Sequence, residues 1–205
     1  MASPKNRTRQ PKISAGATEQ IDGSRSPGGP KPIETSFRKF PDGTMVELVR
    51  GAECAEELQL LVWRRGKARI CSSFLKDSEL LVPPRVTPGL AGAIQFPSAI
   101  STYKDLVDVV TDIVVAARAH VRFSNQEDAY LVAAYVLSTW LVDRFAHAPY
   151  LSVIGTLGSG KTQLLRFLSC CCRRPLLLAD ISAAGLYSLT DQLQPTLLLD
   201  EAAFG

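Results

Sequence analysis

Residues 155–162 have the composition of a loop that holds phosphate groups. They read Gly-Thr-Leu-Gly-Ser-Gly-Lys-Thr and match the pattern G-x-x-x-x-G-K-[ST] at every fixed position. Glycines let backbone N–H groups close around a polyphosphate without a Cβ atom in the way. The Lys161 ammonium is expected to reach the β- and γ-phosphates, and the Thr162 hydroxyl to bind Mg²⁺. The predicted nucleotide-binding residues are Gly155, Thr156, Leu157, Gly158, Ser159, Gly160, Lys161 and Thr162.

The flanking segments agree with this interpretation. Tyr150–Ile154 is a short apolar, β-branched run that predicts a buried strand. Gln163–Cys172 carries apolar residues at helical spacing, which predicts a helix. The helix would point the positive end of its dipole at the bound phosphates. Strand, glycine-rich loop and helix follow in the order that a phosphate-binding loop needs.

A second candidate motif is an apolar run that ends in two carboxylates, Pro195–Glu201. We interpret it as a strand whose Asp200 holds Mg²⁺ through the water shell of the ion. Glu201 would be the general base that polarises an attacking water, so Lys161 and Glu201 are the predicted catalytic residues. The alternative is a strand that simply ends at a solvated acidic turn. An Asp-Glu pair at this place is typical of the ATPase branch of P-loop proteins.

The segment between the two motifs contains one more predicted strand and one more predicted helix. Pro175–Asp180 reads as a short strand, and Ser182 could cap a helix that runs through Leu186 and Leu189. Alternating strands and helices give a parallel sheet with helices on its faces. We therefore expect an α/β fold with a parallel sheet, preceded by a helical segment and a small β-containing region.

Three stretches of this chain together resemble the ATPase core of primase/helicase-like proteins of phages, plasmids and other mobile elements. They are residues 148–162, 178–187 (Leu-Ala-Asp-Ile-Ser-Ala-Ala-Gly-Leu-Tyr) and 194–201, and the similarity extends over roughly 125–205. The resemblance implies ATP and Mg²⁺ as cofactors, an ATP-driven activity on DNA during replication or mobilisation, and DNA and further copies of the protein as candidate partners.

The family's core continues beyond the point that corresponds to Gly205. Its next strands include one with a polar sensor residue, which inserts between the strands of the two motifs, and an arginine for a neighbouring site usually follows. The resemblance therefore implies that residues 148–205 are the N-terminal part of a P-loop ATPase domain with an incomplete P-loop NTPase parallel sheet. We expect weak Mg-ATP binding and slow or absent hydrolysis. A non-catalytic ATP-binding remnant is the alternative.

The first 33 residues are rich in Pro, Gly, Ser, Lys and Arg and poor in large apolar residues, which predicts a disordered tail. They hold six basic and two acidic side chains, a net charge of +4, whereas the whole chain of 205 residues is at +3. A solvated linker is the favoured interpretation, and electrostatic binding of nucleic acid is the alternative.

Residues 34–100 have short apolar runs broken by turns, which predicts a small β-containing region. Phe37–Phe40, Thr44–Val49, Leu58–Trp63 and Ala68–Cys71 are the candidate strands. Basic residues cluster next to Trp63 at positions 64, 65, 67 and 69. An aromatic side chain in such a cluster can clamp a nucleic acid strand, although a hairpin with a solvated face is the commoner arrangement.

Residues 101–147 predict a helical segment that packs on the ATPase core. An apolar stripe runs from Leu106 to Ala117 at helical spacing. Ser124–Glu127 has the pattern of a capping box before a second helix, Asp128–Phe145. That helix is too short in its apolar part to span a membrane, so we expect it to be buried against the sheet. For Tyr135 and Trp140, core packing is favoured over a place beside adenine.

The five cysteines include three in a row, Cys170–Cys172. Adjacent cysteines on a helix point in different directions and cannot easily share one tetrahedral metal, so no structural metal is predicted. With no secretory signal pattern at the start of the chain, we expect a reducing cytoplasm, the bacterial cytosol, and no membrane contact. The basic tail and the Trp63 cluster leave open a second function class, a nucleic-acid-binding accessory protein with a vestigial phosphate-binding loop.

Overall fold

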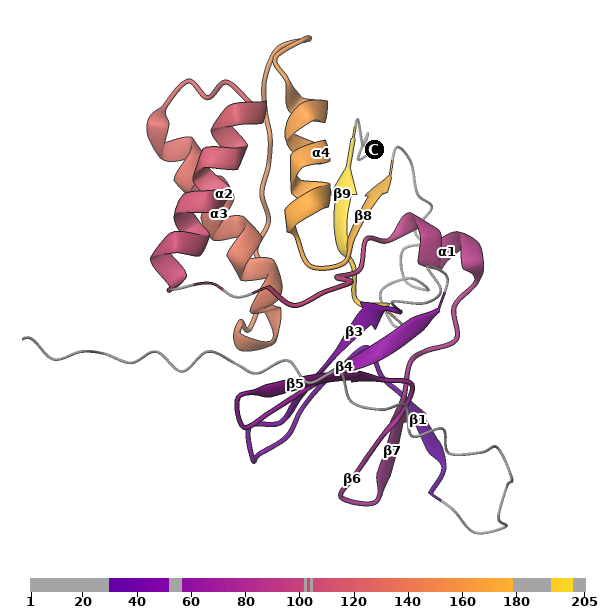
Figure 1. Cartoon of the computed structure of the whole chain (residues 1–205). Coiled ribbons are helices and arrows are strands. Elements are labelled where there is room, and N and C mark those ends of the chain that lie inside the picture. Colours follow the sequence, from indigo (N-terminus) through magenta and orange to yellow (C-terminus); the bar gives the residue numbers. More distant parts are fainter. Residues whose placement is uncertain (1–29, 52–56, 102, 104, 179–192, 201–205) are drawn as a thin grey trace, which may run out of the picture. The chain divides into compact units, whose positions relative to one another are not determined.

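The computed structural model describes residues 30–51, 57–101, 103, 105–178 and 193–200 (Figure 1). They divide into two compact units. The β unit comprises the described residues up to Thr87 together with 97–104. The α/β unit comprises Pro88–Phe96 and the described residues from Asp105 onward. The molecule is thus a mixed α/β protein, as predicted.

The β unit is built on an antiparallel sheet of four strands in sequence order. These are β2 (Phe37–Lys39), β3 (Met45–Arg50), β4 (Leu58–Arg64) and β5 (Lys67–Cys71). Side chains alternate along β4, where Leu58, Leu60 and Val62 are buried and the residues between them are partly exposed. This is the period of two that puts one face of a strand into a core. The four predicted strands are confirmed.

A second sheet of three strands was not predicted. In it β1 (Pro32–Glu34) runs parallel to β7 (Glu79–Val82), and β7 pairs antiparallel with β6 (Phe74–Lys76). Strands of three or four residues carry too little alternation to be recognised in a sequence. Because β1 begins at Pro32, the tail predicted for residues 1–33 extends too far at its end. Residues 1–29 lie outside the described part of the chain.

The α/β unit has three of its helices on one side of a pair of strands. The short helix α1 (Pro88–Ala93) is followed by α2 (Leu106–His120), α3 (Gln126–Trp140), the 3-10 turn Val142–Arg144 and α4 (Lys161–Cys171). The strands β8 (Pro175–Leu178) and β9 (Thr196–Leu199) pair in parallel. Figure 1 shows α4 between the α2–α3 pair and the two strands.

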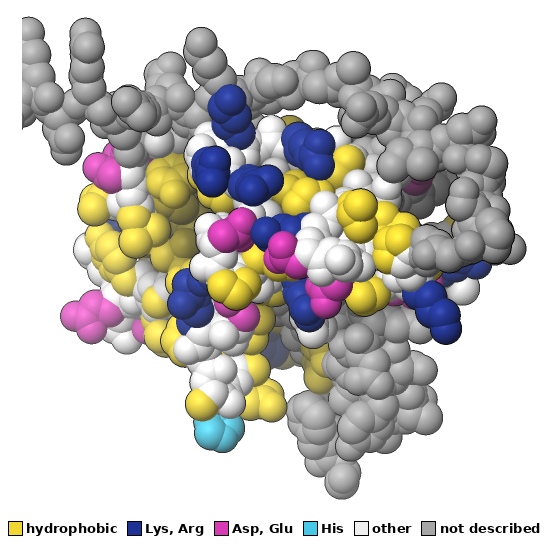
Figure 2. All heavy atoms as spheres, turned by 90° about the horizontal axis from the view of Figure 1, so that it is seen from below, with side chains coloured by type: hydrophobic (Ala, Val, Ile, Leu, Met, Phe, Trp, Pro, Cys, Tyr) yellow, Lys and Arg dark blue, Asp and Glu magenta, His cyan; other side chains and the backbone are white. Residues whose placement is uncertain are grey.

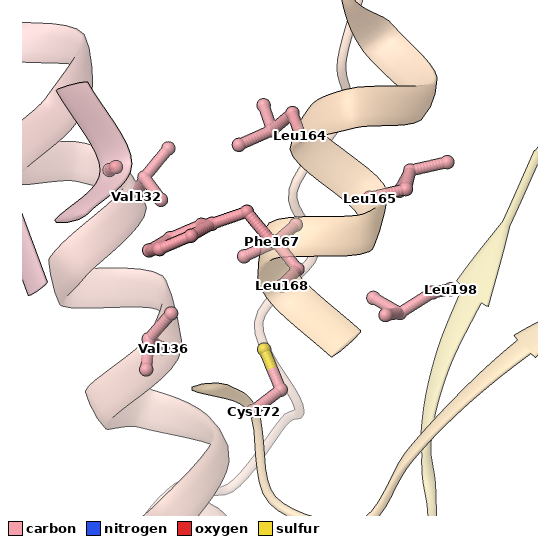
Figure 3. Close-up of a cluster of buried hydrophobic side chains, with 9 residues drawn as sticks. Val132, Val136, Leu164, Leu165, Phe167, Leu168, Cys172 and Leu198 are labelled. Carbon is pink, nitrogen blue, oxygen red and sulfur yellow. The ribbon is translucent and has the colours of Figure 1, made fainter. Parts of the chain in front are cut away.

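The core of this unit forms around α4. Figure 3 shows Leu164 and Phe167 of α4 turned toward Val132 and Val136 of α3, and Leu198 of β9 turned toward α4 from the other side. Apolar residues at helical spacing on both sides of α4 explain why a single helix can join the helical layer to the sheet.

Three details of the helical prediction are wrong. The capping box is not formed, because α3 begins after Asn125 and no side chain caps it. The helix also ends at Trp140, five residues before the predicted end. Finally, α3 packs on α2 and α4, not on the sheet, since α4 already covers it.

Trp140 does not lie in the core. It is 40% exposed, and its Nε1 donates to the carbonyl of Cys171 at 3.0 Å. That carbonyl belongs to the last turn of α4, where backbone acceptors have no partner within the helix. The indole therefore closes the end of α4. Tyr135 matches the prediction better, because it is half-buried against the core cluster and burial raises the pKa of its phenol.

No helix among the described residues is both long and apolar enough to cross a membrane.

Candidate functional site

The loop Gly155–Thr162, predicted to bind phosphate, has a backbone conformation that depends on its glycines. Gly158 and Gly160 have φ angles of +76° and +91°, in the region that side chains disfavour. Gly155 is needed for a different reason, since a Cβ atom there would overlap the Ser159 hydroxyl. All three glycines are thus used: two for the turn, and one for the close approach of the two ends of the loop.

The helix α4 begins at the end of this loop, as predicted. Gly160 is its N-cap residue and offers no side chain, and the first turn contains no acidic residue. The N–H groups of a first helical turn have no partner within the helix and attract anions. No negative side chain within the turn competes for this place.

Lys161 folds back over the loop. Its Nζ donates to the carbonyl of Gly155 at 2.8 Å and to the carbonyl of Thr156 at 2.9 Å. These two contacts hold the ammonium against the backbone at the start of the loop. The sequence motif named the lysine but not the carbonyl oxygens that position it.

The two motifs come together at Thr162 and Asp200. The Thr162 hydroxyl donates to Oδ2 of Asp200 at 3.0 Å, across 38 residues of sequence. Asp200 directly follows β9, and its backbone N–H donates to the carbonyl of Leu178 at 3.0 Å. The parallel pairing of β8 with β9 therefore fixes the position of the carboxylate, and the first turn of α4 fixes the hydroxyl.

The turn between α4 and β8 holds this arrangement from the opposite end. Arg174 is 1% exposed, has a φ of +48°, and donates from Nη1 to the carbonyl of Leu193 at 2.6 Å. The backbone N–H of Arg173 donates to the Thr139 hydroxyl at 3.0 Å. Sequence analysis missed both contacts, because a basic pair after a helix resembles an ordinary solvated turn.

The predicted strand Tyr150–Ile154 is wrong as a strand. The segment is in no strand ladder with the described residues. Leu151 and Val153 pack against the core cluster, whereas Tyr150 is 97% exposed and Ile154 is 92% exposed. The exposure of its side chains alternates as in a strand, but it makes no sheet hydrogen bonds with the part of the chain that the structure describes. The parallel sheet described here consists of β8 and β9.

Of the predicted site residues, Gly155–Thr162 and Asp200 lie in the described part of the chain. Glu201 lies outside it, as does the predicted helix that follows Ser182. Within the described residues, no group of three or more His, Cys, Asp or Glu side chains could hold a metal ion by itself. A cation at Thr162 and Asp200 would therefore need further ligands from water and from phosphate oxygens, as Mg²⁺ commonly does.

Comparison with known proteins adds nothing to this geometry. No protein-family model, curated protein or solved structure matches the chain.

Proposed function

We propose that the α/β unit binds a nucleoside triphosphate together with Mg²⁺. The observation that carries the proposal is the 3.0 Å hydrogen bond between Thr162 and Asp200, because it joins two motifs that the sequence identified separately. If β9 only ended at a solvated acidic turn, nothing would require the Asp200 carboxylate to lie within hydrogen-bonding distance of the Thr162 hydroxyl. The glycine conformations and the uncapped start of α4 support the same proposal.

Different residues of the loop, of α4 and of the end of β9 would bind different parts of the Mg²⁺–nucleotide complex. Backbone N–H groups of the loop and of the first turn of α4 would hold the phosphate oxygens, and Lys161 would neutralise their charge. Thr162 and Asp200 would hold Mg²⁺, which, when bound, offsets charge on the phosphates. The loop recognises phosphates, so the proposal covers nucleoside triphosphates as a class, with ATP the member that the sequence motifs favour.

Hydrolysis and a role in the DNA replication of mobile elements form a wider proposal. The first depends on Glu201, and the second rests on the resemblance of the sequence motifs alone. Binding without turnover remains the alternative activity for the chain of 205 residues.

A titration of the purified chain with a fluorescent ATP analogue tests the proposal. We expect saturable binding that requires Mg²⁺ and that inorganic tripolyphosphate reverses by competition, since the loop contacts phosphates. Lys161→Ala should abolish binding, while Lys39→Ala, which removes an exposed lysine of β2, should leave it unchanged. Circular dichroism shows whether each variant is folded. Equal binding by folded Lys161→Ala and Lys39→Ala proteins would refute the assignment.

A further inference from the structure

The hairpin between β4 and β5 concentrates positive charge at its tip. Arg64, Arg65, Lys67 and Arg69 are all exposed, and residues 64–69 contain no acidic side chain. Arg65 and Gly66 have φ angles of +50° and +75°, as the two-residue turn of a tight hairpin requires. The backbone thus presents these cations on a well-defined turn and not on an irregular loop. Figure 2 shows one face of the molecule with several Lys and Arg side chains and with Asp and Glu side chains between some of them.

Two features of this tip destabilise the hairpin. Arg64 and Lys67 are direct partners across the two strands, where like charges repel. Arg65 adopts a left-handed conformation that asparagine or glycine would adopt more easily. A neutral residue in place of Lys67 would relieve the repulsion, and Asn or Gly in place of Arg65 would relieve the strain.

Neighbouring acids compensate only part of the charge. Asp42 lies 4.0 Å from Arg64, but the same carboxylate is 3.0 Å from the ammonium of Lys76. Arg69 instead lies over the ring of Phe74, at 5.5 Å from its centroid. Arg65 and Lys67 make no ion pair with any residue that the structure describes. A negatively charged ligand would neutralise the remaining positive charge of the hairpin tip.

An apolar strip lies beside the tip on one face of the sheet. Met45, Trp63 and Ala68 form a row across β3, β4 and β5, and Ile70 lies two residues along β5 on the same face. Met45 is 37% exposed and Ile70 is 38% exposed, while Trp63 is half-buried. By the alternation of β4 and β5, the side chains of Arg64, Lys67 and Arg69 lie on the opposite face of the sheet, so a ligand meets both the cations and the indole where it passes over the tip of the hairpin at Arg65.

We propose that the β4–β5 hairpin binds single-stranded nucleic acid, with phosphates at Arg64, Arg65 and Lys67 and a base against Trp63. Evenly spaced negative charges and flat apolar bases occur together in a single strand, and basic surfaces with an adjacent aromatic side chain bind such strands without sequence preference. A duplex presents the charges but keeps its bases stacked inside. The proposal is independent of nucleotide binding by the α/β unit.

Fluorescence anisotropy with a labelled oligothymidylate tests the hairpin in the full chain. Arg65→Glu/Lys67→Glu is compared with Lys31→Glu/Arg166→Glu, which changes net charge equally at exposed positions in other elements. Every variant keeps the basic residues of the first 29 positions, so the difference between the two reports the hairpin. We expect the hairpin variant to bind about tenfold more weakly or worse at low salt, because binding depends on the phosphates neutralised.

The salt dependence gives a second reading. Removal of one cation that neutralises a phosphate should reduce the slope of log K against log salt by about 0.7 for a single strand. The neutral variant Arg65→Asn/Lys67→Gln places a residue that tolerates positive φ in the turn, and it should reduce the slope by about 1.4. If the charge-reversed variant Arg65→Glu/Lys67→Glu does not fold, the slope measured with Arg65→Asn/Lys67→Gln tests the proposal. Equal affinities and slopes for the hairpin and control variants would overturn the proposal.

The base contact is tested by the fluorescence of Trp63. The chain has two tryptophans, so Trp140→Phe leaves Trp63 as the only one. Unlabelled oligothymidylate should quench it, whereas a duplex of equal length should quench it less. Quenching by anionic phosphatidylserine vesicles but not by the oligonucleotide would overturn the assignment of nucleic acid as the partner.

Discussion

The Thr162 hydroxyl and the Asp200 carboxylate lie 3.0 Å apart, although one belongs to the first turn of a helix and the other to the end of a strand. Such a contact between distant segments depends on the whole core between them. Leu165 and Leu198 belong to the same buried cluster and join α4 to β9 (Figure 3). The candidate site is therefore a product of the packing of α4 on the strands, and not only of a local loop.

Replacing Thr162 separates the role of its hydroxyl from that of its position. Thr162→Ala should lower the affinity for Mg-ATP to near the value measured with EDTA, because the variant lacks the proposed Mg²⁺ ligand. Thr162→Ser keeps the hydroxyl and should retain most of the Mg²⁺ dependence. A titration with and without Mg²⁺ measures both. If Thr162→Ala kept the full Mg²⁺ dependence, the hydroxyl would have no part in holding the ion.

Gly155→Ala tests the close approach within the loop. Its Cβ would overlap the Ser159 hydroxyl and come within 3.2 Å of the Ser159 Cβ, so the Ser159 side chain or the loop must shift. We expect nucleotide binding to weaken about tenfold or more, or about 1.4 kcal/mol. The double variant Gly155→Ala/Ser159→Ala removes the overlapping oxygen and should recover part of the affinity. Gly92→Ala is the control, since nothing lies within 4 Å of a Cβ placed there. Absence of any recovery in the double variant would argue against this explanation.

The three adjacent cysteines should differ sharply in reactivity. Cys170 is exposed, Cys171 is intermediate and Cys172 is buried in the core cluster. Burial raises the pKa of Cys172 to about 12, and the thiolate is the reactive form. Iodoacetamide at pH 8, followed by tandem mass spectrometry, should modify Cys170 first and Cys172 more than about 100-fold more slowly. Urea should remove the difference. Fast labelling of Cys172 in the native protein would mean that α4 does not pack as described.

Sequence analysis predicted what depends on local pattern. The helix after the loop 155–162 and the strand before Asp200 each carry a signal within about ten residues, and both are found. The prediction of a buried strand at Tyr150–Ile154 was wrong in two respects. Leu151 and Val153 are partly buried but Tyr150 and Ile154 are exposed, and the segment pairs with no described strand. An apolar run cannot show whether a hydrogen-bonding neighbour is present.

Contacts between distant residues were not predictable in this way. The Trp140 indole on the Cys171 carbonyl, and the Arg174 guanidinium on the Leu193 carbonyl, join side chains to backbone atoms. Any residue type can offer a carbonyl, so no sequence pattern marks the acceptor. The Thr162–Asp200 pair could be anticipated only because both partners belong to motifs with known roles.

The acid sensitivity of the β unit should depend on Asp42. Its carboxylate accepts from the backbone N–H of Thr44 at 3.0 Å and pairs with Lys76 at 3.0 Å, which holds the pKa of Asp42 well below its usual value. A carboxyl group whose pKa is lower in the folded state adds stability above its unfolded pKa of 3.8, and this stability is lost as the pH falls toward the folded pKa. Asp42→Asn should therefore lower the urea midpoint at pH 7, and its difference from the parent protein should shrink progressively below pH 3.8.

The matched variant for this prediction is Asp77→Asn. Asp77 also lies near Lys76, at 3.3 Å, but its side chain is 68% exposed and it lacks the Thr44 contact. Its replacement should shift the midpoint less than Asp42→Asn, because an exposed ion pair contributes little. Lys76, the cationic partner of Asp42, titrates at high pH. Hydrogen bonding to Asp42 raises the pKa of Lys76 above its usual 10.5, so its contribution persists to higher pH and is lost only as the pH rises through the folded value. An Asp42→Asn effect that stayed constant from pH 7 to pH 3 would show that the carboxylate charge does not stabilise this turn.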